Sequence, residues 1–348
     1  MTENDRRADL ERLAPDSITT RFFYHSFPYQ DSNGEGDLLS DATIEQGLAT
    51  LTGIMEIGLL LTPESWSVPP EYVDDGPEPE PIPIYQKRVC FTAITPRELA
   101  THADYFGPFS LEFEIELLRR MGATPVTYVP TTVGTKLDYG GASVSMVHRL
   151  VEIRSILKRL QRMREICGQQ NVPGPIQMSC GASQRHRQIR ASTEGVLDVV
   201  NCVEDGIRDS ETLVAVVDAL SSYMYPSESA DSDRFLEYFQ EKEWRITNAV
   251  VHSATGDGLH SALTLEEKVR LNELSPDYFG QTIEMKSGKI SVADGCLAIR
   301  LFDGQGIFEL CRRVIIPAQA MKKARQILPA EARSKLISFE SLRNDESA

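Results

Sequence analysis

The chain lacks the patterns that identify several common classes of protein. It contains no run of roughly 18 apolar residues, so we expect no transmembrane helix and no membrane partner. Its first residues, MTENDRRADLERLAP, include no apolar core, and we expect no secretory signal there. None of the six cysteines stands at C-x-x-C spacing, which argues against structural zinc and favours a reducing cytoplasm.

Familiar catalytic and phosphate-binding motifs are absent too. The chain has no G-x-x-x-x-G-K-[ST] loop, no G-x-G-x-x-G turn, no G-x-S-x-G elbow and no H-E-x-x-H pair. These absences argue against P-loop nucleotide hydrolysis, serine hydrolysis and zinc proteolysis. The net charge of −15 argues against nucleic-acid binding over the whole surface and leaves a local basic patch open.

A stretch rich in aromatic and β-branched residues, 88–130, organises the chain. Its sequence is RVCFTAITPRELATHADYFGPFSLEFEIELLRRMGATPVTYVP. Residues 88–92 predict a short buried strand, and residues 105–114 predict a second strand interrupted by Gly107 and Pro108. A third strand is expected over 125–129. Between the first two strands we expect a helix over about 96–103, anchored or capped by His102.

Segments far away in the sequence are predicted to join the same sheet. Residues 21–27, RFFYHSF, predict an aromatic strand that carries His25 and Ser26. The cluster 241–245, EKEWR, leads into a strand over 244–251. Further strands are expected over 289–293, 297–302 and 312–316, the first two separated by a turn at Asp294 and Gly295.

Helices are predicted around these strands. Ser40 and Asp41 are candidate N-caps for a helix over roughly 43–51 or beyond, and a second short helix is expected over 53–61. Pro317 opens a helix that we expect to reach about residue 328. Residues 68–83 carry six prolines among acidic residues and predict an extended loop.

A long helix is predicted over 145–170, followed by helices over 193–207 and 211–224. Apolar residues of the long helix recur at 4-3-4-3 spacing and form a narrow seam. We expect this seam in the core rather than in a dimeric coiled coil, because it runs for only about three heptads. We expect the arginines of this helix to form a solvated face rather than to contact nucleic acid. The seam residues are Met146, Leu150, Ile153, Leu157 and Leu160.

These elements together predict an α+β fold with a central, mostly antiparallel twisted sheet and flanking helices. We expect a single domain over 1–348, with the Pro/Glu-rich loop at 68–84 and a helical insertion at 140–230. Residues 231–330 return to the sheet and add the C-terminal helix. No pattern here indicates an oligomeric state.

The order of these blocks resembles the AbiGi-type abortive-infection family, whose members are described as phage-resistance antitoxins of bacteria. The resemblance rests on Cys90-Phe91-Thr92 followed by His102, on the Pro-Val-x-Tyr strand 125–128, and on Glu-Lys-Glu-Trp-Arg at 241–245. It covers roughly residues 20–250 in separate blocks. The Pro/Glu-rich loop, the long insertion and the added C-terminal elements depart from the family. The resemblance implies phage defence through binding of a protein partner, such as a toxin.

A second, more distant similarity is to the layout of ADP-ribosyltransferase folds. It implies NAD as the cofactor and assigns catalytic roles to Glu243, His25 and Tyr105. A carboxylate stabilises the charge that develops on the ribose when the nicotinamide bond breaks. In this hypothesis Glu243 is that carboxylate, His25 and Ser26 hold the ribose, and Tyr105 stacks on nicotinamide. Arg245 would clamp a phosphate.

Each of these residues also has a structural interpretation. His25 lies among aromatic residues, where a histidine is often a hydrogen-bonded residue of the core or of a sheet edge. Tyr105 can serve as a packing residue beside Gly107. Glu241, Glu243 and Arg245 can form ion pairs while Trp244 fills the core. Three functions therefore remain open: a phage-defence protein that acts by binding, an ADP-ribosyltransferase acting on a macromolecule, and a degenerate transferase fold that only binds a nucleotide.

Overall fold

The computed structural model describes residues 21–28, 39–68, 82–129, 139–168, 176–180, 187–207, 210–226, 242–248, 260–285 and 288–344. The chain forms two compact units. Unit 1 contains the described parts of Met1–Trp66, Pro83–Tyr128 and Ser227–Ala348, and unit 2 those of Ser67–Ile82 and Val129–Pro226. The predicted organisation, one domain with an insertion at 140–230, stays a prediction.

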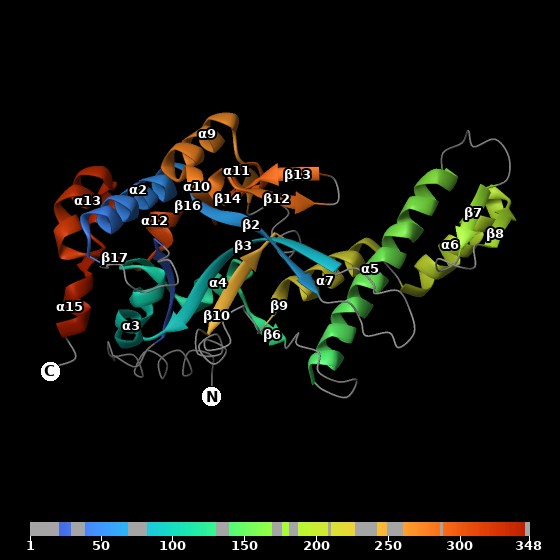
Figure 1. Ribbon diagram of the computed structural model, residues 1–348, viewed down its shortest axis with the longest axis horizontal. Coiled ribbons are helices and arrows are strands. Elements are labelled where there is room, and N and C mark those ends of the chain that lie inside the picture. The colour runs from blue at the N-terminus through green and yellow to red at the C-terminus, as the bar shows by residue number, and fades with distance from the viewer. Residues whose placement is uncertain are drawn as a thin grey trace, which may run out of the picture. The chain divides into compact units, whose positions relative to one another are not determined.

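The predicted α+β class is confirmed, and a ten-stranded, mostly antiparallel sheet forms the centre of unit 1 (Figure 1). Eight strands follow one another in the order β11-β14-β2-β3-β1-β4-β17-β18, while β10 pairs with β3 and β5. The strands are β1 (Phe22–Phe27), β2 (Leu59–Val68), β3 (Ile82–Ile94), β4 (Phe109–Phe113), β5 (Thr124–Pro125), β10 (Glu243–Thr247), β11 (Ser261–Ala262), β14 (Leu297–Ile299), β17 (Arg313–Ile316) and β18 (Leu336–Ser338).

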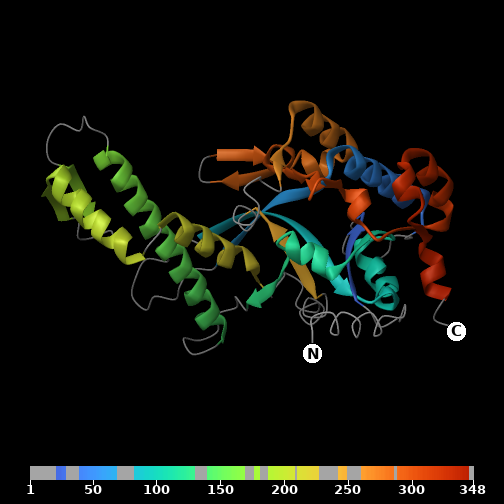
Figure 2. The ribbon, with the colours of Figure 1, turned by 180° about the vertical axis from the view of Figure 1, so that it is seen from behind.

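Alternation of side chains along the strands gives the sheet two buried faces. Phe23, Phe91 and Phe113 lie on one face, in the main core. Helix α2 packs on this core, and it lies beside α13 in both views (Figures 1 and 2). On the other face, Tyr24 packs with Leu99 of α3 in a smaller cluster. The helices of unit 1 are α2 (Asp41–Ile57), α3 (Pro96–Phe106), α4 (Ile115–Arg120), α9 (Leu265–Leu274), α10 (Pro276–Phe279), α11 (Val292–Gly295), α12 (Ile307–Leu310), η2 (Ala318–Ala320), α13 (Met321–Ile327), α14 (Ala330–Arg333) and α15 (Phe339–Asn344).

Two pairs of short strands complete unit 1. Strands β12 (Thr282–Met285) and β13 (Gly288–Ser291) form one antiparallel hairpin, and β15 (Leu301–Phe302) and β16 (Gln305–Gly306) form the other. Asp303 and Gly304 both have positive φ in the tight turn of the second hairpin, as a two-residue turn of this kind requires.

Unit 2 is mostly helical. Helix α5 (Tyr139–Gly168) packs against α6 (Thr193–Ile207) and α7 (Ser210–Tyr223), and β7 (Ile176–Cys180) pairs with β8 (Arg187–Ala191). The last strand of unit 2 is β9 (Met224–Pro226), and β6 (Thr127–Val129) lies at the boundary between the units. Among the described residues, no helix combines the length and apolar character needed to cross a membrane.

Several predicted elements are confirmed. Ser40 caps α2, since its hydroxyl accepts a hydrogen bond from the backbone N–H of Thr43. The strand that carries His25 and Ser26 is β1, and Glu243, Trp244 and Arg245 of the EKEWR cluster join the predicted sheet through β10. The helix predicted over 193–207 has those bounds in the structure.

Other predictions of local structure are wrong. Residues 53–61 do not form a second helix, because α2 continues to Ile57 and residues from Leu59 onward form β2. Asp294 and Gly295 lie in the short helix α11 rather than in a turn, since Ser291 caps it. The strand expected over 297–302 is divided into β14 and β15.

The apolar seam predicted for the long helix is only partly buried. Leu157 is buried and Leu150 and Leu160 are half-buried, but Met146 and Ile153 are exposed. The expectation that this seam lies in the core is therefore wrong at Met146 and Ile153. Residues 69–81 of the Pro/Glu-rich loop, together with Glu241, lie outside the described residues.

Candidate functional site

The candidate site is built on strand β3, which pairs with both β1 and β10. In the antiparallel ladders, Thr92 is the partner of Tyr24 on β1 and of Glu243 on β10. Cys90 is the partner of Arg245. Because paired residues point to the same face and alternate residues share a face, Glu243, Arg245, Cys90 and Tyr24 all point to one side of the sheet.

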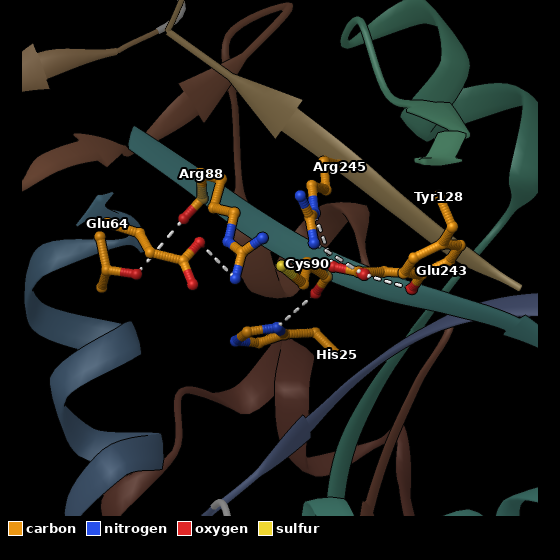
Figure 3. Close-up of polar contacts among 8 residues, drawn as sticks. His25, Glu64, Arg88, Cys90, Tyr128, Glu243 and Arg245 are labelled. Carbon is orange, nitrogen blue, oxygen red and sulfur yellow. Dashed lines mark hydrogen bonds and ion pairs between the residues drawn. The ribbon is translucent and has the colours of Figure 1, made fainter. Parts of the chain in front are cut away.

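Glu243 and Arg245 form an ion pair on this face (Figure 3). Nε of Arg245 donates to Oε1 of Glu243 at 2.7 Å, and Nη2 donates to Oε2 at 2.9 Å. The hydroxyl of Tyr128 donates to Oε2 at 2.8 Å, so both carboxylate oxygens accept hydrogen bonds. Arg245 is only 1% exposed. A buried guanidinium requires such a partner, because an isolated charge inside a protein is strongly unfavourable.

The surroundings keep Glu243 ionised. Burial by itself raises the pKa of this carboxyl, but the charge and hydrogen bonds of Arg245 outweigh burial, and the net pKa is lowered. The charge of Arg88 and a hydrogen bond from Cys90 act in the same direction. Glu243 is therefore an anion matched to a fixed cation.

Cys90 lies beside this pair and stays protonated. Burial, together with the negative charge of Glu243, raises the pKa of the Cys90 thiol to about 12. A thiol of this kind is a poor nucleophile, because the reactive form is the thiolate. We therefore assign Cys90 a hydrogen-bonding role.

A second ion pair lies on the neighbouring part of β3. Nη2 of Arg88 is 2.5 Å from Oε2 of Glu64 on β2, and the hydroxyl of Thr62 donates to the backbone carbonyl of Arg88. Figure 3 shows the two ion pairs on either side of Cys90. The site is thus a row of paired charges and polar groups across three adjacent strands.

His25 does not point to the face that carries Glu243. It neighbours Tyr24 in β1 and pairs with Leu111 of the main core, so its side chain lies on the opposite face. Its ring lies 5.7 Å from that of Phe91, and Nδ1 donates to the backbone carbonyl of Cys90 at 3.0 Å. Burial lowers the pKa of His25, which favours the neutral ring.

Ser26 lies on the same face as Tyr24 and belongs to a polar group that extends through His102 to Thr92, the register partner of Glu243. Its hydroxyl is 2.8 Å from that of Ser110 and 3.4 Å from Nδ1 of His102 on α3. Nε2 of His102 is 2.9 Å from the hydroxyl of Thr92. Burial lowers the pKa of His102 to about 4. His102 therefore anchors α3 to the sheet as a neutral side chain, as the sequence suggested.

Tyr105 is not in a strand, and that prediction is wrong. It lies in the last turn of α3, which ends at Phe106, and its side chain is exposed. Helix α3 contacts the strands of the site at Glu98, where Nζ of Lys242 is 2.7 Å from Oε1 of Glu98, and at His102, which contacts Thr92, the register partner of Glu243. Because His25 points to the opposite face of the sheet, Tyr105, His25 and Glu243 do not share one face.

Sequence reasoning identified Glu243 and Arg245 but missed Glu64, Arg88, Cys90 and Tyr128 as their surroundings. The i, i+2 spacing of Arg88 and Cys90 matches that of Glu243 and Arg245 and places each pair on one face of its strand. Only the pairing of β3 with β10 shows that the two faces coincide.

The charged side chains of this face are held in two ion pairs, Glu243 with Arg245 and Glu64 with Arg88. Among the described residues, no cluster of three or more His, Cys, Asp or Glu side chains could hold a metal ion.

No family model matches the chain, and neither a curated protein nor a solved structure matches it.

Proposed function

We propose that this chain is a cytoplasmic phage-defence protein of the AbiGi type that acts by binding a protein partner. One observation carries the choice of binding over catalysis. Both oxygens of Glu243 accept hydrogen bonds from Arg245 and Tyr128, while His25 points to the opposite face of the sheet. The carboxylate that an ADP-ribosyltransferase would use is thus already occupied by the chain's own side chains.

The positions of the motifs that carry the family resemblance support the same proposal. Cys90-Phe91-Thr92 and Glu243-Trp244-Arg245 are adjacent strand segments, paired residue by residue. Trp244 packs on the main core, with its ring 5.0 Å from that of Phe23. His102 holds Thr92 of the first motif. These residues therefore stabilise the sheet, and a binding protein needs such residues to hold its binding surface in one conformation.

A phage challenge of the native host strain tests this proposal. Three strains are compared: one with the chain intact, one with the chain deleted, and one with Glu243→Gln and Arg245→Met together. This double substitution removes the carboxylate without leaving a buried charge unpaired. We expect deletion to raise the efficiency of plating of at least one phage and the double variant to keep the protection.

Two results would contradict the proposal. An equal efficiency of plating on the intact and deleted strains, across a broad panel of phages, would show that the chain does not protect against phage. Loss of protection by a double variant that is folded and present at the normal level would indicate that Glu243 acts chemically. The second result would favour the alternative, an NAD-dependent transferase or nucleotide-binding protein.

A further inference from the structure

Helix α5 of unit 2 carries an apolar seam whose two halves are covered differently. This seam shares Met146, Ile153 and Leu160 with the predicted one but follows a different stripe of the helix, at steps of seven, three or four residues. Its members are Met146, Ile153, Ile156, Leu160, Met163 and Cys167. In the C-terminal half, buried Cys167 clusters with Val196 and Val200 of α6, and Leu160 and Met163 pack against this cluster.

The N-terminal half of the seam is open. Met146 and Ile153 are each 44% exposed and Ile156 is 56% exposed. Exposed aliphatic side chains in a row of this kind are typical of interaction surfaces. We call Met146, Ile153 and Ile156 the open seam.

The charges of unit 2 indicate what this seam accepts. Helix α5 contains six Lys or Arg and two Glu, whereas α6 contains four Asp or Glu and no Lys or Arg. Helix α7 likewise contains two acidic residues and no basic one. Arg154 of α5 forms an ion pair with Asp218 of α7. Both helices that pack on α5 are therefore acidic, in complement to its basic character.

We propose that the open seam docks an acidic amphipathic helix of a partner protein. A helix fits, because side chains spaced three and four residues apart form ridges that pack against those of another helix. The C-terminal half of the same seam already packs against helix α6. An acidic helix fits, because two arginines flank the open seam on the exposed surface of α5. Arg159 stands three residues after Ile156, and Arg149, which also pairs with Glu152 of its own helix, stands four residues before Ile153. The α5 helix of a second copy would instead bring two basic faces together. This inference rests on the proposed binding function and names the chemistry of the partner.

A peptide-binding experiment on the full chain tests the docking. The probe is a helix-stabilised, fluorescein-labelled peptide with the sequence of residues 193–207, TEGVLDVVNCVEDGI, which is the acidic helix that the seam already accepts. Stabilisation is needed, because an isolated helix of this length is marginal in water. Fluorescence anisotropy should show saturable binding that weakens as salt is raised.

Three comparisons make the test specific. Ile153→Glu should weaken binding by about tenfold or more, since it places a charge in the centre of the open seam. Leu265→Glu is the matched control, because Leu265 is 79% exposed on α9 of unit 1, and it should leave binding unchanged. A peptide with its four acidic residues replaced by lysine should also bind about tenfold more weakly.

Absence of binding, equal binding of the lysine peptide, or equal binding by the Ile153→Glu chain would each overturn the inference. A wild-type dimer in light scattering that becomes a monomer in Ile153→Glu would assign the open seam to a second copy and overturn it too. If the peptide fails to bind while the intact chain still protects against phage, this inference fails and the proposed function stands.

Discussion

Glu243 and Arg245 lie two residues apart on strand β10 and bind each other through two hydrogen bonds on one buried face of the sheet. Removing one member leaves the other as an unpaired buried charge. Glu243→Ala should therefore lower the free energy of unfolding by about 3–5 kcal/mol. The Glu243→Gln, Arg245→Met double variant should lose less, because it leaves neither charge behind. Urea denaturation followed by circular dichroism measures both, and equal losses in the two proteins would contradict this account.

His102 makes stability depend on pH in a defined window. Its pKa falls from 6.5 to about 4 on folding, so below pH 6.5 the unfolded chain takes up a proton that the folded chain does not. Stability contributed by neutral His102 is complete above pH 6.5 and is lost as the pH falls toward about 4. The loss is on the order of 3 kcal/mol.

Replacing His102 with Gln tests that window and keeps side-chain atoms able to bond Thr92 and Ser26. Denaturation at pH 7.5 and pH 4.5 should show a smaller loss of stability in His102→Gln than in the wild type. His25, whose pKa is also lowered, is present in both proteins, so the difference isolates His102. Identical pH slopes would show that His102 does not stay neutral in the fold.

The capping box of α3 links the helix to the strand of the candidate site. Thr95 accepts a hydrogen bond from the N–H of Glu98, Glu98 accepts from the N–H of Thr95, and Lys242 pairs with Glu98. Thr95→Ala should cost about 1 kcal/mol of unfolding free energy. Burial by itself raises the pKa of Glu98, but the hydrogen bonds from Lys242 and Thr95 and the charge of Lys242 together outweigh it and lower the pKa to about 2.

Glu98 of this capping box also makes the free energy of unfolding depend on pH, in a window below that of His102. Because the folded pKa of Glu98 is below its usual 4.5, its contribution is present above pH 4.5 and is lost as the pH falls toward about 2. Glu98→Gln should remove that part of the acid transition, and added salt should weaken the effect, since the Glu98 side chain is partly exposed. An unchanged acid transition would indicate that the Lys242 contact does not persist in solution.

Two glycines of α2 form a matched pair. A Cβ on Gly47 would lie 2.3 Å from the ring of Phe109, whereas a Cβ on Gly53 would meet only Leu274 at 3.4 Å. Gly47→Ala should lower the free energy of unfolding by about 1–3 kcal/mol through overpacking. Gly53→Ala should be neutral or stabilise by up to about 1 kcal/mol through helix propensity. Thermal denaturation of both variants checks the contrast, which would fail if they behaved alike.

Local sequence signals were sufficient for the start of α3, which was predicted at residue 96 and begins at Pro96 after the cap Thr95. Its end was missed, because the helix was predicted to stop at about 103 and continues to Phe106, before Gly107 with φ of 90°. The prediction that Tyr105 begins a strand failed because the alternation of β4 was extended backward across Gly107. Likewise, the prediction of a separate helix over 53–61 failed because the apolar residues 59–61 are compatible with helix and strand alike.

The candidate site was harder to predict, because it depends on pairing between distant segments. The sequence left two interpretations of Glu243 and Arg245 open, an ion pair with each other and a role in ligand binding. The ion pair is confirmed. The contribution of Tyr128, 115 residues before Glu243, required the tertiary fold. The opposite orientation of His25 required the register of β1 against β3 and β4.

Calorimetry of the wild-type chain with NAD tests the central claim most directly. The account predicts no saturable heat at millimolar NAD, because Glu243 is occupied by Arg245 and Tyr128 and His25 points away from it. Saturable binding of NAD that disappears in the Glu243→Gln, Arg245→Met variant would contradict the account and make Glu243 a ligand of the nucleotide.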